Sequence, residues 1–415
     1  MAAPFSVDAA RALSGPAWLV ERRVAAAERL AAGSLPTSAQ EVWRYSPIDK
    51  LDLADYHPAA TPPTGRPSLT GLAAALVDAL SERAGLVFTV DGALVHAEGD
   101  GLVVEEATPD LLAAVAPPHD ALTDLHDAFA ASPLAVVIPR GKVVAEPLVV
   151  LHLVTGGGVL ACPRVVVHAQ ERAEASVVEV FVGADDQAGA LVLPITSLVA
   201  DQGAHLRHAA VQALGPAVWT LAHNGSRVER DATLQSIAIA LGGAYARLRT
   251  DAALTGQGGE STLLAAYVGD GDQVHDFRTM QDHWAPRTRS ELVFKGAVGG
   301  HSHGVYSGLI KVHKGAKGTQ AFQTNRNLVL SETAHADSVP NLEIDENDLA
   351  CSHASAVGPI DPQQRFYLEA RGVPTKVADR LIVLGFLDDV LARSPIPGLR
   401  EPIARELARR VEVVT

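Results

Sequence analysis

A thiol and an imidazole two positions apart, Cys351 and His353, are the side chains of this sequence best suited to bind a metal. Cysteine and histidine are ligands that iron and zinc prefer. In a strand, side chains at i and i+2 point to the same side, so both would face one site. Asp348 could then orient the imidazole as an acceptor. The alternative interpretation is a small buried Cys351 and a turn residue at 353, because free cysteines are usually buried and unreactive.

The cysteine count limits what the chain can do alone. It has only Cys162 and Cys351, whereas an iron–sulfur cluster usually takes about four cysteine or histidine ligands. Any cluster here must therefore take ligands from another chain. Two cysteines so far apart provide no disulfide framework, which is typical of a reducing cytoplasm.

Histidines offer a second metal hypothesis. His301 and His303 lie two positions apart, with His275 and His283 nearby, and two histidines on one strand can share a metal. A zinc site needs further ligands, and glycines flank the pair, so solvated loop histidines are the alternative. His335 is interpreted as a structural or surface histidine.

Nucleotide chemistry is not indicated. The sequence has no G-x-x-x-x-G-K-[ST] segment, and Gly156–Gly158 precedes a predicted strand rather than a helix. Any ATP chemistry is therefore expected in another subunit, and no nucleotide is expected on this chain.

Composition narrows the class further. The 415 residues carry a net charge of −14, which argues against nucleic acid or an anionic membrane as partner. No signal peptide is visible in the first twelve residues, and no uncharged run reaches the about 18–20 residues of a membrane span. We expect a soluble, cytoplasmic protein.

Three regions follow from the hydrophobic pattern. Residues 1–131 are predicted to be helical, with a proline-rich linker near 57–68. Residues 132–358 alternate with period two and predict a mainly β core, either a sandwich or a parallel β-solenoid. Small and amide residues at inward positions, such as Ala238, Asn325 and Asn327, favour the solenoid.

Residues 359–415 are predicted to form helices. Asp361–Pro362 is a helix start and Gly372 a stop. The next predicted helix is apolar on more than one face, so it either packs on the solenoid from several sides or contacts a partner.

Three segments resemble one family. P-N-L-E-I-D-E-N-D-L-A-C-S-H from Pro340, Y-S-G-L-I-K-V-H-K-G from Tyr306 and E-V-W-R-Y-S-P-I-D-K-L from Glu41 are similar to SufD, a scaffold subunit of the Suf iron–sulfur assembly machinery. The likeness covers most of the chain. The triplet C-S-H favours SufD over its paralogue SufB, although Ala354-Ser355-Ala356 departs from the usual Gly-Ala-Thr.

The resemblance implies a right-handed parallel β-helix flanked by N-terminal and C-terminal helices, and a non-enzymatic scaffold. It implies a SufB-like paralogue as heterodimer partner, a SufC-like ATPase docked on the C-terminal helices, and a transient cluster shared with the paralogue; a homodimer is an option in isolation. Metal ligation is assigned to His353, with Cys351 beside it. The expected docking residues are Leu381, Leu384, Phe386 and Leu387.

Two other functions are considered. A carbohydrate-active β-helix enzyme would usually be secreted and rich in aromatic residues, whereas this chain has 5% aromatics. A mononuclear metalloenzyme would centre on His301 and His303.

Overall fold

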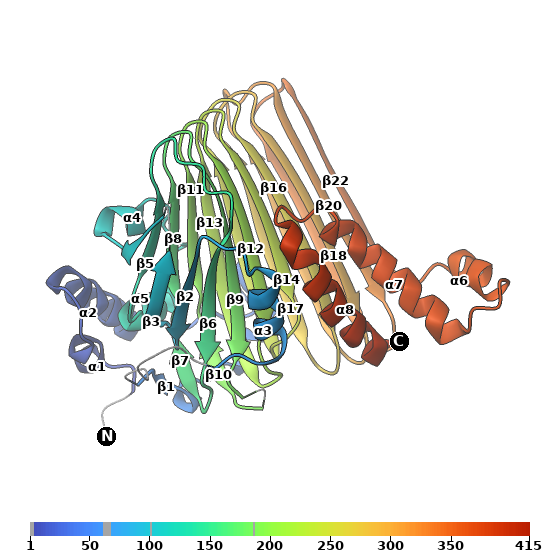
Figure 1. The fold of residues 1–415 in the computed structure, drawn as a ribbon, viewed down its shortest axis with the longest axis horizontal. Coiled ribbons are helices and arrows are strands. Elements are labelled where there is room, and N and C mark those ends of the chain that lie inside the picture. The colour runs from blue at the N-terminus through green and yellow to red at the C-terminus, as the bar shows by residue number, and fades with distance from the viewer. Residues whose placement is uncertain (1–3, 61–67, 100–101, 186) are drawn as a thin grey trace.

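The protein is a parallel β-solenoid with helices at both ends of the chain (Figure 1). The computed structural model describes residues 4–60, 68–99, 102–185 and 187–415. The predicted mainly β fold with flanking helices is confirmed. Of the predicted proline-rich linker near 57–68, residues 61–67 lie outside the described residues.

Two sheets form the walls of the solenoid. Within the described residues, a twelve-stranded sheet has the order β21-β19-β17-β15-β13-β11-β8-β5-β4, with β1, β7 and β10 beside it, and a ten-stranded sheet has the order β22-β20-β18-β16-β14-β12-β9-β6-β2-β3. The strands of the first sheet are β1 His57–Pro58, β4 Val103–Glu106, β5 Leu134–Ile138, β7 Val159–Ala161, β8 Arg164–Ala169, β10 Ala190–Val192, β11 Ile195–Ala200, β13 Val218–Val228, β15 Tyr245–Leu254, β17 Val274–His283, β19 His303–Val312 and β21 His335–Ile344. Those of the second are β2 Gly85–Val90, β3 Ala93–Gly99, β6 Leu148–Val154, β9 Glu174–Gly183, β12 His205–Ala213, β14 Thr233–Ala240, β16 Glu260–Gly269, β18 Arg289–Val298, β20 Thr319–Val329 and β22 Leu349–Gly358.

Each coil places one strand in each sheet, directly beside the strand of the previous coil. Tyr245 pairs with Val274, Val274 with His303, and His303 with His335. The turns between strands differ in length, so the spacing between paired residues changes along the chain. This variation explains why the sequence shows no strict repeat.

Alternating residues fill the narrow lumen. In the C-terminal coils the rings of Tyr267 and Phe277 lie 4.9 Å apart, centroid to centroid, and those of Phe277 and Phe294 5.5 Å apart. Asn325 and Asn327 are buried, and the Asn327 amide donates to Oδ1 of Asn325 at 2.9 Å. The predicted inward position of these two amides is confirmed.

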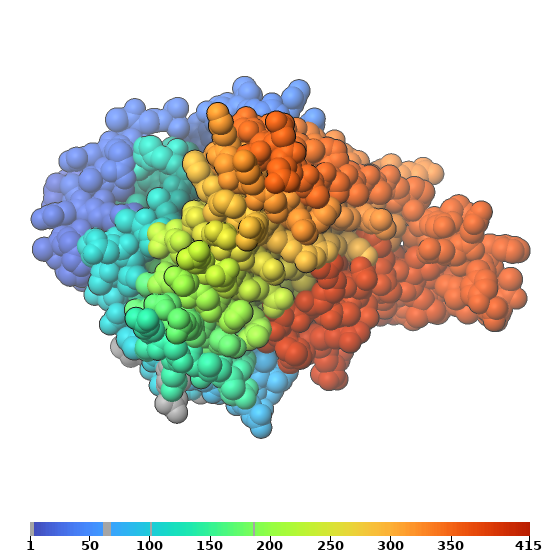
Figure 2. Space-filling model, turned by 90° about the horizontal axis from the view of Figure 1, so that it is seen from above, coloured from blue at the N-terminus to red at the C-terminus, as the bar shows by residue number. Residues whose placement is uncertain are grey.

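Helices cover the outer faces of both sheets. The ten-stranded sheet is covered by α3 (Gly71–Ala79), α7 (Thr375–Leu391) and α8 (Arg400–Val414). The twelve-stranded sheet is covered near its N-terminal strands by α1 (Val7–Ala12), α2 (Ala17–Ala32), α4 (Pro109–Ala113) and α5 (Ala121–Phe129). The 3-10 helices are Glu41–Trp43, Ile48–Lys50, Leu53–Asp55 and Pro397–Leu399. The short helix α6 (Pro362–Glu369) projects from the body of the protein (Figures 1 and 2).

The solenoid begins earlier than the sequence indicated. Strand β2 pairs in parallel with β6, so the predicted boundary at residue 132 lies inside the solenoid and not at its start. Every residue of Gly85–Val90 is buried. A strand covered on both faces shows no alternation of apolar and polar residues, so the period-two pattern does not reveal it.

The family-like segment that starts at Glu41 is held against the outer face of the twelve-stranded sheet. Arg247 donates to the Val42 carbonyl at 2.7 Å, and its guanidinium lies 3.9 Å from the Trp43 ring centroid. Asp276 accepts hydrogen bonds from Arg247 at 2.7 Å and Arg278 at 2.6 Å. Burial by itself raises the pKa of the Asp276 carboxyl, but the two guanidinium groups outweigh burial and hold that pKa below its usual range.

Candidate functional site

The two ends of the solenoid differ. At the N-terminal end, the short strands β3 and β4 pair antiparallel with β2 and β5 and terminate the two sheets. At the C-terminal end, β21 and β22 are ten residues long, and each is the last strand of its sheet among the described residues. Most side chains of β22 are exposed. Long uncovered edge strands present unpaired backbone groups to another chain, so we call β21 and β22 the open end.

Strand β22 carries both predicted metal ligands on its inward side. Its register pairs Cys351 with Ala321 and His353 with Gln323, and these two partners are buried in the lumen. Ser355, the next residue of the same row, donates across the lumen to Ser338 at 2.7 Å. The predicted strand geometry, with Cys351 and His353 on one side, is therefore confirmed. The alternative of a turn residue at 353 is wrong.

The environments of Cys351 and His353 differ. Cys351 is half-buried against a cluster that includes Ile310, Val312 and Ala321. Burial raises the pKa of the Cys351 thiol, although a backbone hydrogen bond at Ala321 acts in the opposite direction. The metal-binding thiolate is thus disfavoured at Cys351. His353 is exposed at the mouth of the lumen, where an incoming group can reach its ring.

A buried amide lies in the coil behind His353. Gln323 is 1% exposed, and neither Nε2 nor Oε1 has a hydrogen-bond partner among the described residues. Gly308 faces this amide: a Cβ at Gly308 would lie 2.2 Å from Nε2 of Gln323 and 2.3 Å from the Tyr306 hydroxyl. The absence of a side chain at 308 therefore makes room for the amide. Buried polar groups without partners are uncommon in folded proteins and need an explanation.

The other predicted histidine group does not form. His275 and His283 lie in the lumen row of β17 and are fully buried, whereas His301 lies in an exposed turn and His303 begins β19 on the outer face. His275 and His283 therefore face the lumen while His303 faces outward, so the hypothesis that these two buried histidines join His301 and His303 in one site is wrong.

His275 and His283 are held neutral. His283 hydrogen bonds through Nδ1 to Thr288 at 2.7 Å and through Nε2 to Ser290 at 2.8 Å. Burial lowers the pKa of His275 and of His283 to about 4. The partnered imidazole of His283 therefore serves as a structural polar group.

A second buried polar group lies deeper in the lumen and was missed by sequence reasoning. Glu179 accepts hydrogen bonds from His208 at 2.9 Å, from His152 at 3.2 Å and from the Thr196 hydroxyl at 2.8 Å. Burial raises the pKa of Glu179, but the bonds from the two histidines outweigh burial and hold that pKa well below its usual range. The group is enclosed, so it stabilises the interior and offers no access to a substrate.

The C-terminal helices place the four expected docking residues in different environments. Leu381 is 49% exposed, Leu384 and Phe386 are half-buried, and Leu387 lies in the core against the ten-stranded sheet. Leu387 is therefore unavailable to a partner in this conformation, and its assignment to a docking surface is corrected. Leu381 remains the accessible member of the set.

Sequence reasoning missed the exposed aromatic residues of α6. Phe366 is 70% and Tyr367 57% exposed, on the helix that projects from the body (Figure 2). Arg365 donates to Asp379 of α7 at 2.6 and 3.0 Å, which fixes α6 on α7. The residue types of Phe366 and Tyr367 alone do not show whether these aromatic side chains are exposed or buried.

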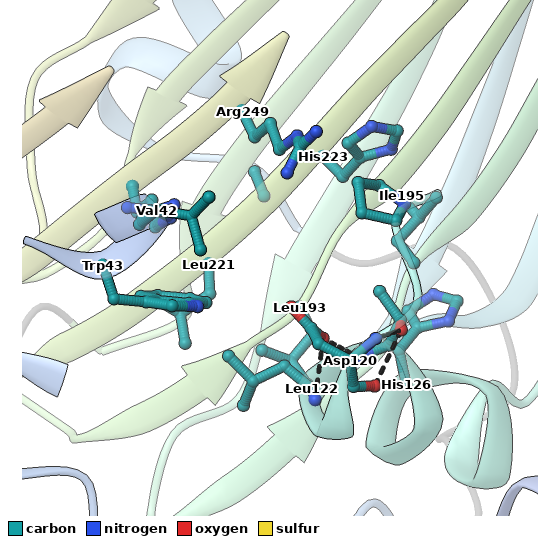
Figure 3. A pocket seen from close by; sticks show the side chains of 14 residues that line it. Val42, Trp43, Asp120, Leu122, His126, Leu193, Ile195, Leu221, His223 and Arg249 are labelled. Atoms are coloured by element: carbon teal, nitrogen blue, oxygen red, sulfur yellow. Dashed lines mark hydrogen bonds between the residues drawn. The ribbon is translucent and has the colours of Figure 1, made fainter. Parts of the chain in front are cut away.

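A pocket lies where the N-terminal region packs against the twelve-stranded sheet (Figure 3). Its Asp120 caps α5 by accepting from the backbone of Leu122 and Thr123 at 3.0 and 2.9 Å. His126 hydrogen bonds to the Pro163 carbonyl at 3.3 Å, and His223 pairs with Asp251 at 3.1 Å. Each of these three side chains has at least one structural partner, so the open end remains the candidate site.

A parallel solenoid with a cysteine–histidine strand at its open end is the architecture expected of the iron–sulfur assembly scaffolds that the sequence resembles. The family described as "SUF system FeS cluster assembly, SufBD core domain" matches residues 152–386, which include β22. An iron-sulfur cluster assembly SufBD family protein of Mycobacterium tuberculosis is 31% identical over 388 residues, 91% of this chain and 90% of the relative. SufD of Escherichia coli is 30% identical over 400 residues, covering 92% and 91%. SufD of Bacillus subtilis is 26% identical over 292 residues, covering 70% and 67%.

This chain belongs to the SufBD family of iron–sulfur cluster assembly proteins. The resemblance to SufD inferred from the sequence is confirmed by relatives of that name. Among the helices of the described ranges, none is both long and apolar enough to cross a membrane. The cytoplasmic location expected from composition stays a prediction.

Proposed function

We propose that this chain is a non-catalytic scaffold subunit that pairs with a SufB-like paralogue through the open end of its solenoid. The exposed edges of β21 and β22 support this pairing, because a second solenoid can continue both sheets there. The paralogue is the expected heterodimer partner, and a homodimer through the same edges is an option for the isolated chain.

The observation that carries the proposal is the position of His353. It lies on the inward side of the terminal strand and is exposed at the mouth of the lumen. A neutral imidazole there is a borderline ligand that can complete an iron site together with a thiolate from the paralogue. The iron–sulfur cluster is the transient cargo of this interface. Cys351 has the lesser role, since its half-buried thiol favours the protonated form.

The ATP-driven step is assigned to a SufC-like ATPase docked on α6 and α7. The exposed side chains of Phe366, Tyr367 and Leu381 support this position. Phe366 and Tyr367 lie on α6 and Leu381 lies on α7. We call α6 with the adjoining part of α7 the arm; the buried face of α7 packs on the ten-stranded sheet. Movement of the arm would therefore be transmitted to the solenoid wall.

The test compares His353→Ala with Ser355→Ala, the next inward residue of the same strand. Each variant is co-expressed with the paralogue and the ATPase, and subunit stoichiometry, iron and acid-labile sulfide are measured in the purified complex. We expect intact assembly for both, loss of most iron and sulfide for His353→Ala, and little loss for Ser355→Ala. A fully assembled His353→Ala complex with the iron and sulfide of the unmodified complex would rule out the ligand role.

A further inference from the structure

Three potential metal ligands meet on the outer face of the last two strands of the twelve-stranded sheet. His303 and His335 are the first residues of β19 and β21 and lie directly opposite one another in the register. Asp337 follows His335 by two positions and so lies on the same side of β21. Tyr306 fills the lumen side of β19, so the three ligands face away from the lumen, where the row of His353 lies.

Their atoms are already close. Nε2 of His303 lies 2.7 Å from Oδ2 of Asp337, and the His303 and His335 ring centroids are 3.8 Å apart with 26° between the ring planes. One ligand atom from each of the three side chains lies within 4.8 Å of the others. An ion with bonds of about 2.0–2.2 Å draws its ligand atoms to roughly 3–4 Å from one another. His335 is exposed, so rotation of its ring can close the remaining gap.

The ligand types select the ion. Two imidazoles and one carboxylate on one side of an ion, with open positions toward solvent, suit Fe²⁺, Co²⁺ or Zn²⁺ rather than the oxygen-preferring Mg²⁺ or Ca²⁺. His303 and Asp337 are half-buried, which limits competition from water on one side of the ion. The exposed side remains accessible for loading.

This group of three ligands differs from the polar cluster around Glu179 in its access to solvent. Glu179, His152 and His208 are enclosed and partnered inside the lumen. His303, His335 and Asp337 border solvent and lie at the open end.

We propose that His303, His335 and Asp337 bind one divalent transition-metal ion, Fe²⁺ or Zn²⁺, with solvent completing its coordination. This site is distinct from the cluster site proposed at His353 and does not depend on it. Binding would fasten β21 to β19, because the ligands come from both strands.

The experiment titrates the full-length chain with Co²⁺ under anaerobic conditions and follows d–d absorption, with Zn²⁺ as competitor. We expect one saturable site per chain and displacement by Zn²⁺. His335→Ala and Asp337→Asn should each weaken binding by at least about 10- to 100-fold, since even loss of a residue that only supports a ligand has that effect. His301→Ala removes an exposed histidine outside the group and is the matched control, expected to bind as the unmodified chain.

Absence of a saturable site in the unmodified chain would overturn the proposal, and so would unchanged binding in folded His335→Ala and Asp337→Asn variants. Thermal unfolding without metal checks that the variants fold. His353→Ala should keep full Co²⁺ affinity, which separates failure of this site from failure of the proposed cluster function. Equal loss on His301→Ala would assign the signal to non-specific histidine binding and reject the site.

Discussion

Gln323 lies beside His353 in the register of β20 and β22, and its buried amide has no hydrogen-bond partner among the described residues. The exposed imidazole at the mouth of the lumen thus has an unpaired donor and acceptor directly behind it. A buried polar group without a partner costs about 1–3 kcal/mol. We therefore expect the Gln323 amide to gain a hydrogen-bond partner only when cargo or another subunit is bound at His353.

Gln323→Met should separate folding from function. Methionine has a similar length without the polar atoms, so we expect the isolated chain to gain about 1 kcal/mol in its free energy of unfolding, measured by denaturant titration. The same variant in the assembled complex should retain less iron and sulfide. The matched control is Asn325→Leu, which removes the acceptor of the Asn327 amide and should destabilise the chain. A destabilised Gln323→Met chain would show that the amide has a structural partner.

Charged substitutions on the C-terminal helices should divide into two classes. Leu381→Asp and Phe366→Asp change exposed residues, so the chain should fold and lose ATPase co-purification by roughly tenfold or more, as expected for anchor residues of an interface. Val413→Asp, at a 66% exposed position on α8, is the surface control and should leave co-purification unchanged. Full ATPase recovery with folded Leu381→Asp and Phe366→Asp variants would exclude this face.

Leu387→Asp belongs to the second class, because it places a charge in the core. We expect this variant to lose folding itself, seen as a low melting temperature or insoluble expression. A folded Leu387→Asp chain with selective loss of ATPase would restore the original assignment of Leu387 to the interface.

Acid should destabilise the chain through its lumen histidines. Folding lowers the pKa of His275 and His283 from 6.5 to about 4, so between these values the unfolded chain binds protons that the folded chain does not. The contribution of these two histidines to the free energy of unfolding is therefore fully present above pH 6.5. It falls as the pH drops toward 4, by about 1.4 kcal/mol per pH unit for each histidine. Denaturant unfolding at pH 7, 6 and 5 measures this slope.

The control for the pH effect is His283→Gln, whose amide can still reach Thr288 and Ser290 but does not titrate. Its slope between pH 6.5 and 5 should be smaller than that of the unmodified chain by about 1.4 kcal/mol per pH unit. Equal slopes would mean that His283 is protonated or solvent-accessible in the folded chain.

Local patterns predicted much of the fold. The Asp361 cap is present, since its carboxylate accepts from the Gln363 backbone at 2.8 Å, and Gly372 ends α6 with a φ of 83°. The inward position of Asn325 and Asn327 and the shared side of Cys351 and His353, which the i, i+2 spacing gives in a strand, were correctly predicted. These features depend on residues only a few positions apart, so the sequence reveals them directly.

The misses depend on contacts between distant residues. His335 lies beside His303 only because the turns of that coil have a particular length. A local sequence pattern does not reveal the length of a turn. On α7, Leu381 and Leu387 are both leucines in an apolar helix, and only packing against the ten-stranded sheet distinguishes the exposed one from the buried one. Strand β2 was hidden because it is covered on both faces.

The open end also affects how firmly the chain holds its own terminal coil. In a solenoid each coil is stabilised mainly by its immediate neighbours. In the part of the chain that the structure describes, β21 and β22 have a neighbouring strand on one side only. The free energy of local unfolding of β21 and β22 is therefore expected to be the lowest along the solenoid. A docked second solenoid would supply the missing neighbour, so the strand that carries His353 would become fully ordered only upon assembly. Subunit association would in this way act as a folding step for the metal-binding coil.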